Sequence, residues 1–257
     1  LTPEGLIAAR HLEEQGIPVN FTLGFSAREN FLVACVAQPS WVNIFLGRLN
    51  AYAAGEGLGD GAWVGERTHM ASQAAVKELR ESIGVSTRQI AASMRSGEQV
   101  ATLAGTDVYT MPIAVAEGFL AGSPTAEVLQ DRTGEDYQPS WAEGIDPDAE
   151  GVHKLWEVDA SFKEVCLELA ARDYENLTAA EVLAALDAAG YSDVFPRLTE
   201  NELATLVAEG KAPKRATWQS QLAQGKYGLD GLFTLAGLHA FAQDQAALDE
   251  RIRQQLA

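Results

Sequence analysis

Polar side chains interrupt the most apolar runs in the first half of the sequence, where they could bind a ligand. Asn20 and Thr22 lie two residues apart in one run, and Asn43 stands between Val42 and Ile44 in the next. Side chains two apart on a strand point to the same face, so Asn20 and Thr22 should share one. Unbonded polar groups are costly in a sheet that is buried on both sides. These three side chains are therefore candidates for binding a polar ligand.

Two arginines and a serine follow the ends of neighbouring apolar runs. Arg48 comes just after the second run, and Ser93 and Arg95 end a later one. In α/β barrels the ligand-binding groups come from the carboxyl ends of successive strands. An arginine presents a planar fork of donors that suits a phosphate, and a serine adds a neutral donor. The spacing indicates a phosphate site, with one alternative, in which Arg48 and Arg95 are rim residues paired with surface acids.

The elements that must position these residues alternate along the first half of the chain. Short apolar runs bounded by turn residues predict strands at 17–25, 40–45, 89–93 and 107–111. Amphipathic spacing predicts helices at 4–15, 26–37, 65–83 and 98–104, and Ser26 with Glu29 predicts a capping box for the second of them. Strands and helices that alternate at this spacing predict βαβ units, and hence an α/β fold with a parallel sheet.

The second half of the sequence has a different composition. Residues 1–124 carry 12 acidic and 8 basic side chains, whereas residues 125–257 carry 24 and 11. The second half predicts helices at 160–172, 178–189, 199–209 and 228–255, with the last one split by Gly231 and Gly237. Thr178 with Glu181 and Thr199 with Glu202 predict two more capping boxes. We therefore expect two regions, 1–124 and a helical extension over 125–257.

Charge and cysteine content exclude several classes of function. A net charge of −17 argues against nucleic-acid binding and against attachment to an anionic membrane. No apolar run approaches the roughly 20 residues of a membrane span. Cys35 and Cys166 lie far apart in apolar helical patterns, which indicates buried free thiols and a cytoplasmic protein. The four histidines show no metal-ligand spacing, so we expect no metal and assign them to surface or helix-packing positions.

Several segments, in the right order and across almost the whole chain, resemble the transaldolase family. Residues 2–26 contain Thr2-Pro-Glu-Gly5 and Gly16-Ile-Pro-Val-Asn-Phe-Thr-Leu-Gly-Phe-Ser26, which resemble T-x-E-G and G-I-x-x-N-x-T-x-x-F-S. Residues 43–48 (NIFLGR) are similar to S-P-F-V-G-R, and residues 92–95 (ASMR) to A-S-F-R. Residues 104–112 (AGTDVYTMP) resemble A-G-x-D-x-x-T-x-P, and residues 230–245 resemble the family's C-terminal helix.

This resemblance implies a fold, an activity and a set of roles. The fold would be a (β/α)8 TIM barrel, of which residues 1–124 carry only the strands after strand four. The activity would be transfer of a dihydroxyacetone unit from sedoheptulose 7-phosphate to glyceraldehyde 3-phosphate in the pentose phosphate pathway, through a lysine Schiff base and without a cofactor or metal. The family roles fall on Thr22 for the catalytic water, on Asn20 for substrate hydroxyls, on Phe45 for the pocket wall, and on Arg48, Ser93 and Arg95 for the phosphate. Asn43 also falls at a substrate-binding position.

The sequence departs from the family pattern at several positions. The family lysine would lie three residues before Leu1, and the family's proton-transferring Asp and Glu belong to earlier strands, so we expect a companion N-terminal segment. Asn43 replaces a serine, Met94 a phenylalanine, and Ser96 stands where asparagine is usual. Two alternatives stay open. One is a non-catalytic sugar-phosphate-binding or assembly protein derived from a split barrel, and the other is a helical interaction module in residues 150–257.

Overall fold

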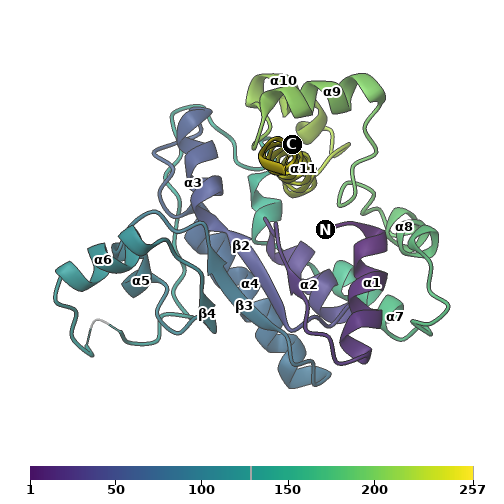
Figure 1. Cartoon of the computed structure of the whole chain (residues 1–257), viewed down its shortest axis with the longest axis horizontal. Coiled ribbons are helices and arrows are strands. Elements are labelled where there is room, and N and C mark those ends of the chain that lie inside the picture. Colours follow the sequence, from purple (N-terminus) through teal and green to yellow (C-terminus); the bar gives the residue numbers. More distant parts are fainter. Residues whose placement is uncertain (128, 257) are drawn as a thin grey trace.

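The computed structural model describes residues 1–127 and 129–256, and its described strands form one parallel sheet (Figure 1). The strands are β1 (Asn20–Phe21), β2 (Trp41–Phe45), β3 (Arg88–Ala92) and β4 (Val108–Tyr109). They follow one another in the order β1-β2-β3-β4, and every neighbouring pair is parallel. The predicted α/β class with a parallel sheet is therefore confirmed.

Helices connect these strands, as parallel pairing requires. The helices of this half are α1 (Pro3–Glu14), α2 (Ala27–Val36), α3 (Leu46–Gly55), α4 (Val64–Ser82), α5 (Glu98–Thr102) and α6 (Ile113–Ala121). The Ser26 hydroxyl caps α2 by accepting from the backbone N–H of Glu29. The Glu29 carboxylate accepts from the N–H of Phe25 rather than from that of Ser26, so only half of this predicted capping box forms.

The two edge strands are much shorter than the runs that predicted them. The run at 17–25 forms only two strand residues, Asn20 and Phe21. Pro18 has no N–H to donate to a ladder, and Leu23 has a positive φ of 62°, which turns the chain out of the strand. The central strands β2 and β3 match their predicted runs to within a residue.

The second half is helical, as the sequence indicates. Its elements are the 3₁₀ turn η1 (Val152–Leu155) and the helices α7 (Ala160–Ala170), α8 (Ala179–Ala188), α9 (Glu200–Glu209), α10 (Arg215–Ala223) and α11 (Leu229–Leu256). Both predicted capping boxes, at Thr178 and at Thr199, are present. None of the helices in the described part is long and apolar enough to cross a membrane.

Helix α11 runs without interruption through Gly231 and Gly237, so the prediction that it splits there was wrong. Both glycines allow close packing instead. A Cβ atom on Gly231 would lie 2.5 Å from Cδ of Pro196, and one on Gly237 would lie 2.9 Å from Cδ2 of Leu23. The absence of a side chain therefore brings the helix against its neighbours.

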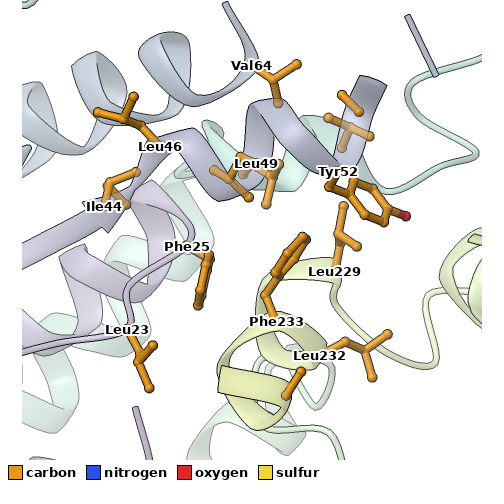
Figure 2. Close-up of a cluster of buried hydrophobic side chains, with 14 of the residues drawn as sticks. Leu23, Phe25, Ile44, Leu46, Leu49, Tyr52, Val64, Leu229, Leu232 and Phe233 are labelled. Carbon is orange, nitrogen blue, oxygen red and sulfur yellow. The ribbon is translucent and has the colours of Figure 1, made fainter. Parts of the chain in front are cut away.

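The core draws on both halves of the chain. Figure 2 shows Phe25 of the β1–α2 loop facing Phe233 of α11, and their rings stack with centroids 4.9 Å apart. A second cluster joins α2 to α7 and holds Cys35 and Cys166, which are buried and free as predicted. Burial raises the pKa of the Cys35 thiol to about 12. The boundary near residue 124 stays a prediction.

A buried ionic cluster also joins the two halves. Arg28 of α2 donates from Nε to Oδ2 of Asp230 at 2.7 Å and from Nη2 to Oδ2 of Asp193 at 2.9 Å. Lys154 donates to the same Asp193 oxygen at 2.8 Å, and the Ser26 hydroxyl donates to Asp230 at 2.7 Å. The arginine and both aspartates are almost inaccessible to solvent. Each buried charge therefore has a partner of opposite sign.

Candidate functional site

Asn20 and Asn43 lie within β1 and β2, and the other predicted site residues lie at or after the carboxyl ends of β1, β2 and β3: Thr22, Phe45, Arg48, Ser93 and Arg95. The first half of α11 packs against the segment after β1 and the end of β2 (Figures 1 and 2). The Thr234 hydroxyl donates to the carbonyl oxygen of Leu23, just after β1, at 3.2 Å. A Cβ atom on Gly237 would lie 3.2 Å from Nη1 of Arg48. The C-terminal helix thus forms a wall of the same region that holds the candidate residues.

The structure brings the two predicted asparagines together. Asn43 on β2 donates from Nδ2 to Oδ1 of Asn20 at 3.1 Å and to the carbonyl oxygen of Phe21 at 3.2 Å. Asn43 is only 2% exposed, and its Oδ1 atom has no hydrogen-bond partner among the described residues. Because a buried acceptor without a donor is costly, this oxygen is suited to accept a hydrogen bond from a bound hydroxyl group.

Thr22 follows β1 and is exposed, as is Asn20. Both line an open groove between α1 and β1 with a volume of about 300 Å³, to which α11 contributes Leu238. The Thr22 hydroxyl is therefore accessible to a water molecule or to a ligand that enters this groove.

Arg48 lies in the first turn of α3 and is half-buried between aromatic rings. Its guanidinium carbon is 5.4 Å from the ring centroid of Phe25 and 5.2 Å from that of Phe45. Its Nη1 atom donates to the carbonyl oxygen of Lys211 at 3.4 Å. Burial, and then the nearby charge of Arg95, lower the pKa of Arg48. Phe45 packs against this guanidinium, and its place in the wall of a substrate pocket stays a prediction.

Ser93 and Arg95 follow β3 and approach the start of α3. A Cβ atom on Gly47 would lie 2.0 Å from the carbonyl oxygen of Ser93, 2.8 Å from Cγ of Arg95 and 3.1 Å from its Nε. The Arg95 side chain thus crosses Gly47, the residue before Arg48. Ser93 has a positive φ of 62°, which turns the chain sharply at the end of the strand.

The two arginines have no direct ionic partner in the described structure. Neither Arg48 nor Arg95 has a carboxylate within 4 Å among the described residues, so the alternative in which they pair with surface acids has no ion pair to support it. Helix α3 begins directly after β2, and no side chain of the described chain caps its first turn. Free N–H groups at a helix start and two guanidinium groups together favour an anion.

The histidines and acids do not form a second chemical centre in the described residues. His69 is fully buried on α4, with Nε2 2.9 Å from the Thr106 hydroxyl, and burial lowers its pKa to about 3. It is a helix-packing residue, as expected. No group of three His, Cys, Asp or Glu side chains within the described ranges is placed to hold a metal ion.

Sequence reasoning missed three polar residues next to the arginines: Asn50, Glu66 and Gln99. They are joined to one another by hydrogen bonds, and Gln99 also accepts from the backbone N–H of Arg95 at 2.6 Å. Each lies within or at the start of a helix and looks like an ordinary surface residue in the sequence. Only the fold brings them together.

Comparisons with known proteins agree with this arrangement. The profile of the family described as Transaldolase/Fructose-6-phosphate aldolase matches residues 1–176. A probable transaldolase of Thermus thermophilus is 36% identical over 142 residues, which are 53% of this chain and 56% of that protein. Probable transaldolases of Hydrogenobaculum and Listeria monocytogenes are also 36% identical, over 46% and 47% of this chain and over 49% and 50% of their own lengths.

The chain spans about half the length of these relatives. The family match covers more than half of the chain, including all four strands and every predicted site residue. The chain therefore belongs to the transaldolase/fructose-6-phosphate aldolase family.

Proposed function

We propose that this chain carries the phosphate-binding half of a transaldolase. The observation that supports this most directly is the meeting of Arg48 and Arg95 at the ends of β2 and β3, with no carboxylate partner for either among the described residues. A sugar phosphate supplies the missing negative charge at one end and hydroxyl groups at the other. Asn43, whose Oδ1 is buried and unpaired in the described chain, stands two residues before Phe45 on the same strand.

In this proposal the four strands are the later half of a (β/α)8 barrel. A preceding segment, on the same or a companion polypeptide, would complete the barrel beside β1 and β4, the edges of the described sheet. It would also bring the lysine that the family resemblance places three residues before Leu1. Parallel strands in sequential order, joined by helices, are what one half of such a barrel contains.

The reaction divides between the two halves. The lysine amine adds to the ketone carbon of sedoheptulose 7-phosphate, and loss of water gives the Schiff base. A base takes the proton of the C4 hydroxyl as the C3–C4 bond breaks, which releases a four-carbon aldose phosphate and leaves a three-carbon enamine. The enamine carbon then bonds to the aldehyde carbon of glyceraldehyde 3-phosphate, whose oxygen takes a proton, and water hydrolyses the new Schiff base.

The residues of this chain have binding roles in that cycle. Arg48, Ser93 and Arg95 hold the phosphate, and this fixes the distance of the reacting carbons from the lysine. Asn20 and Asn43 bind substrate hydroxyls. Thr22, exposed in the groove beside β1, holds the water that forms and hydrolyses the Schiff base.

Trapping the covalent intermediate tests this function. The chain, joined to the segment that bears the lysine, is incubated with fructose 6-phosphate and sodium borohydride and then weighed by mass spectrometry. We expect the mass of a reduced three-carbon adduct, and no adduct when that lysine is replaced by methionine. Binding of fructose 6-phosphate without any adduct would instead favour the non-catalytic sugar-phosphate-binding protein. The absence of both binding and adduct would reject both functions.

A further inference from the structure

A side-chain amide holds the backbone of the segment that carries Arg95. Gln99, in the first turn of α5, accepts through Oε1 from the N–H of Arg95 at 2.6 Å and from the N–H of Ser96 at 3.3 Å. These two residues lie two and three positions after the sharp turn at Ser93. The position of the Arg95 backbone therefore depends on which way the Gln99 amide points.

The carboxylate of Glu66 fixes that direction. Glu66 lies on α4 and is 3% exposed, and its Oε1 atom accepts from Nε2 of Gln99 at 2.7 Å. The backbone N–H groups of Arg95 and Ser96 can only donate, so the amide oxygen of Gln99 faces them and its nitrogen faces the carboxyl group of Glu66. Within the described part of the chain, no lysine, arginine or histidine forms an ion pair with Glu66.

The other side of Glu66 is held by the helix that carries Arg48. Asn50 of α3 donates from Nδ2 to Oε1 and Oε2 of Glu66 at 3.2 Å and 2.9 Å. The Asn50 amide oxygen accepts from the N–H of Gly65 at 2.6 Å, which fixes the orientation of this amide too. Arg48 and Asn50 are two residues apart on α3, so a shift at Glu66 acts on the helix of one arginine and on the loop of the other.

We propose that Asn50, Glu66 and Gln99 form a positioning network that holds Arg48 and Arg95 at the spacing one phosphate group requires. The proposal rests on the phosphate-binding role given to these arginines above. None of the three residues needs to touch the ligand. Their effect is on the affinity for phosphorylated compounds, because only those compounds engage both arginines.

Exchanging the carboxylate at residue 66 with the amide at residue 99 tests this network. In Glu66→Gln the new amide nitrogen is a donor that faces another donor, either Nε2 of Gln99 or Nδ2 of Asn50. If the Gln99 amide turned to avoid this clash, its own nitrogen would face the N–H of Arg95, which is also a donor. The double variant Glu66→Gln with Gln99→Glu restores the contacts of residue 99, whose carboxylate accepts from Arg95, Ser96 and the new amide nitrogen. The new amide oxygen keeps the shorter of the two contacts from Asn50. We expect the single variant to bind inorganic phosphate and fructose 6-phosphate about tenfold more weakly, and the double variant to recover most of that affinity.

Titration calorimetry on the full chain measures these affinities, with fructose as the unphosphorylated ligand and Glu98→Gln as the control. Glu98 is exposed, one residue from Gln99, and has no side-chain hydrogen bond in the described chain. Because Glu66→Gln could loosen the fold, Gln99→Ala provides a second test of the same selective loss.

The results of these titrations distinguish failure of the positioning network from failure of the proposed phosphate site. Equal affinities of wild type and Glu66→Gln for phosphate would overturn the network and leave the proposed function intact. The network would also be overturned if Glu66→Gln lost as much affinity for fructose as for phosphate, or if the double variant did not recover the affinity for phosphate. No phosphate binding by the wild type would overturn the arginine site, and the network with it.

Discussion

Arg48 and Arg95 have no carboxylate partner among the described residues, so we expect both to contribute to the binding of a phosphorylated ligand. Replacing Arg48 or Arg95 by alanine should weaken the binding of fructose 6-phosphate by about tenfold or more, because each removes a charge-assisted hydrogen bond to the phosphate. The affinity for fructose should not change. Titration calorimetry measures both. Arg88→Ala is the matched control, since Arg88 is exposed at the opposite end of β3. A similar loss in that control would contradict a defined site.

At the scale of residues, the sequence singled out polar side chains in apolar strands, and the structure shows which contacts these side chains make. Asn43 was a candidate because of its apolar neighbours, and it is buried with an unpaired oxygen among the described residues. Glu66 and Gln99 gave no such signal. They are 33 residues apart and on different helices, and a hydrogen bond between them depends on a tertiary contact that spacing does not reveal.

At the scale of elements, the start of α3 fits against the β3–α5 loop with no room for a side chain at Gly47. A methyl group there would lie 2.0 Å from a backbone oxygen of Ser93, so the loop must move. We expect Gly47→Ala to destabilise the protein by roughly 1–3 kcal/mol and to weaken phosphate binding. Urea unfolding and the titration described above measure the two effects.

Gly118 of α6 provides the matched control for Gly47. A Cβ atom on Gly118 would have no neighbour closer than 3.8 Å. Gly118→Ala should therefore raise the free energy of unfolding by up to about 1 kcal/mol, through helix propensity alone. If both glycine variants shift the stability in the same direction, the steric argument for Gly47 fails.

The contact between α2 and α11 contains a carboxyl group whose titration should affect stability. Glu29 is 1% exposed and accepts from the Thr234 hydroxyl of α11 at 2.8 Å. Burial, and then the charge of Asp230, raise its pKa from 4.5 to about 7. Between those pH values the folded protein binds more protons at Glu29 than the unfolded chain does. Its contribution to the free energy of unfolding is therefore complete below about pH 4.5 and is lost as the pH rises through about 7.

Replacement of Glu29 by glutamine removes this titration. The stability of Glu29→Gln relative to wild type should increase with pH over that window, by on the order of 1–3 kcal/mol. Urea unfolding of both proteins from about pH 5 to about pH 8 measures the difference. Glu81→Gln, at an exposed carboxyl group, should show no such trend. A pH-independent difference for Glu29→Gln would contradict the raised pKa.

A side-chain cap made a helix predictable, and the amphipathic pattern alone predicted α4 and α5, which have none. Each of α1, α2, α7, α8 and α9 begins with a serine, threonine or aspartate that accepts from a backbone N–H of the first turn, and all five were predicted. The missed helices α3, α6 and α10 begin after Phe45, Pro112 and Lys214, without a side-chain cap. The starts of these helices depend on tertiary packing, which short sequence patterns do not reveal.

At the scale of the whole molecule, the cluster around Arg28 holds the helical half against the sheet half. Arg28→Ala leaves two buried carboxylates without their main partner, so we expect a loss of about 3–5 kcal/mol in the free energy of unfolding. Urea unfolding measures it. The control is Arg253→Ala, which breaks an exposed pair with Glu250 and should cost less than about 1 kcal/mol. A comparably small effect for Arg28→Ala would show that the halves are held by apolar packing alone.

The buried cluster also has a consequence for the order in which the protein matures on the ribosome. Arg28 is 165 residues before Asp193 and 202 before Asp230, and Leu23 is 211 before Thr234. Strands and helices of the first half can form while the chain is still growing. Arg28 meets its second aspartate, and the ends of β1 and β2 receive their covering helix, only after α11 has emerged, about 200 residues after Arg28. Completion of the candidate site therefore waits for α11, although the binding residues that this helix covers are made long before it.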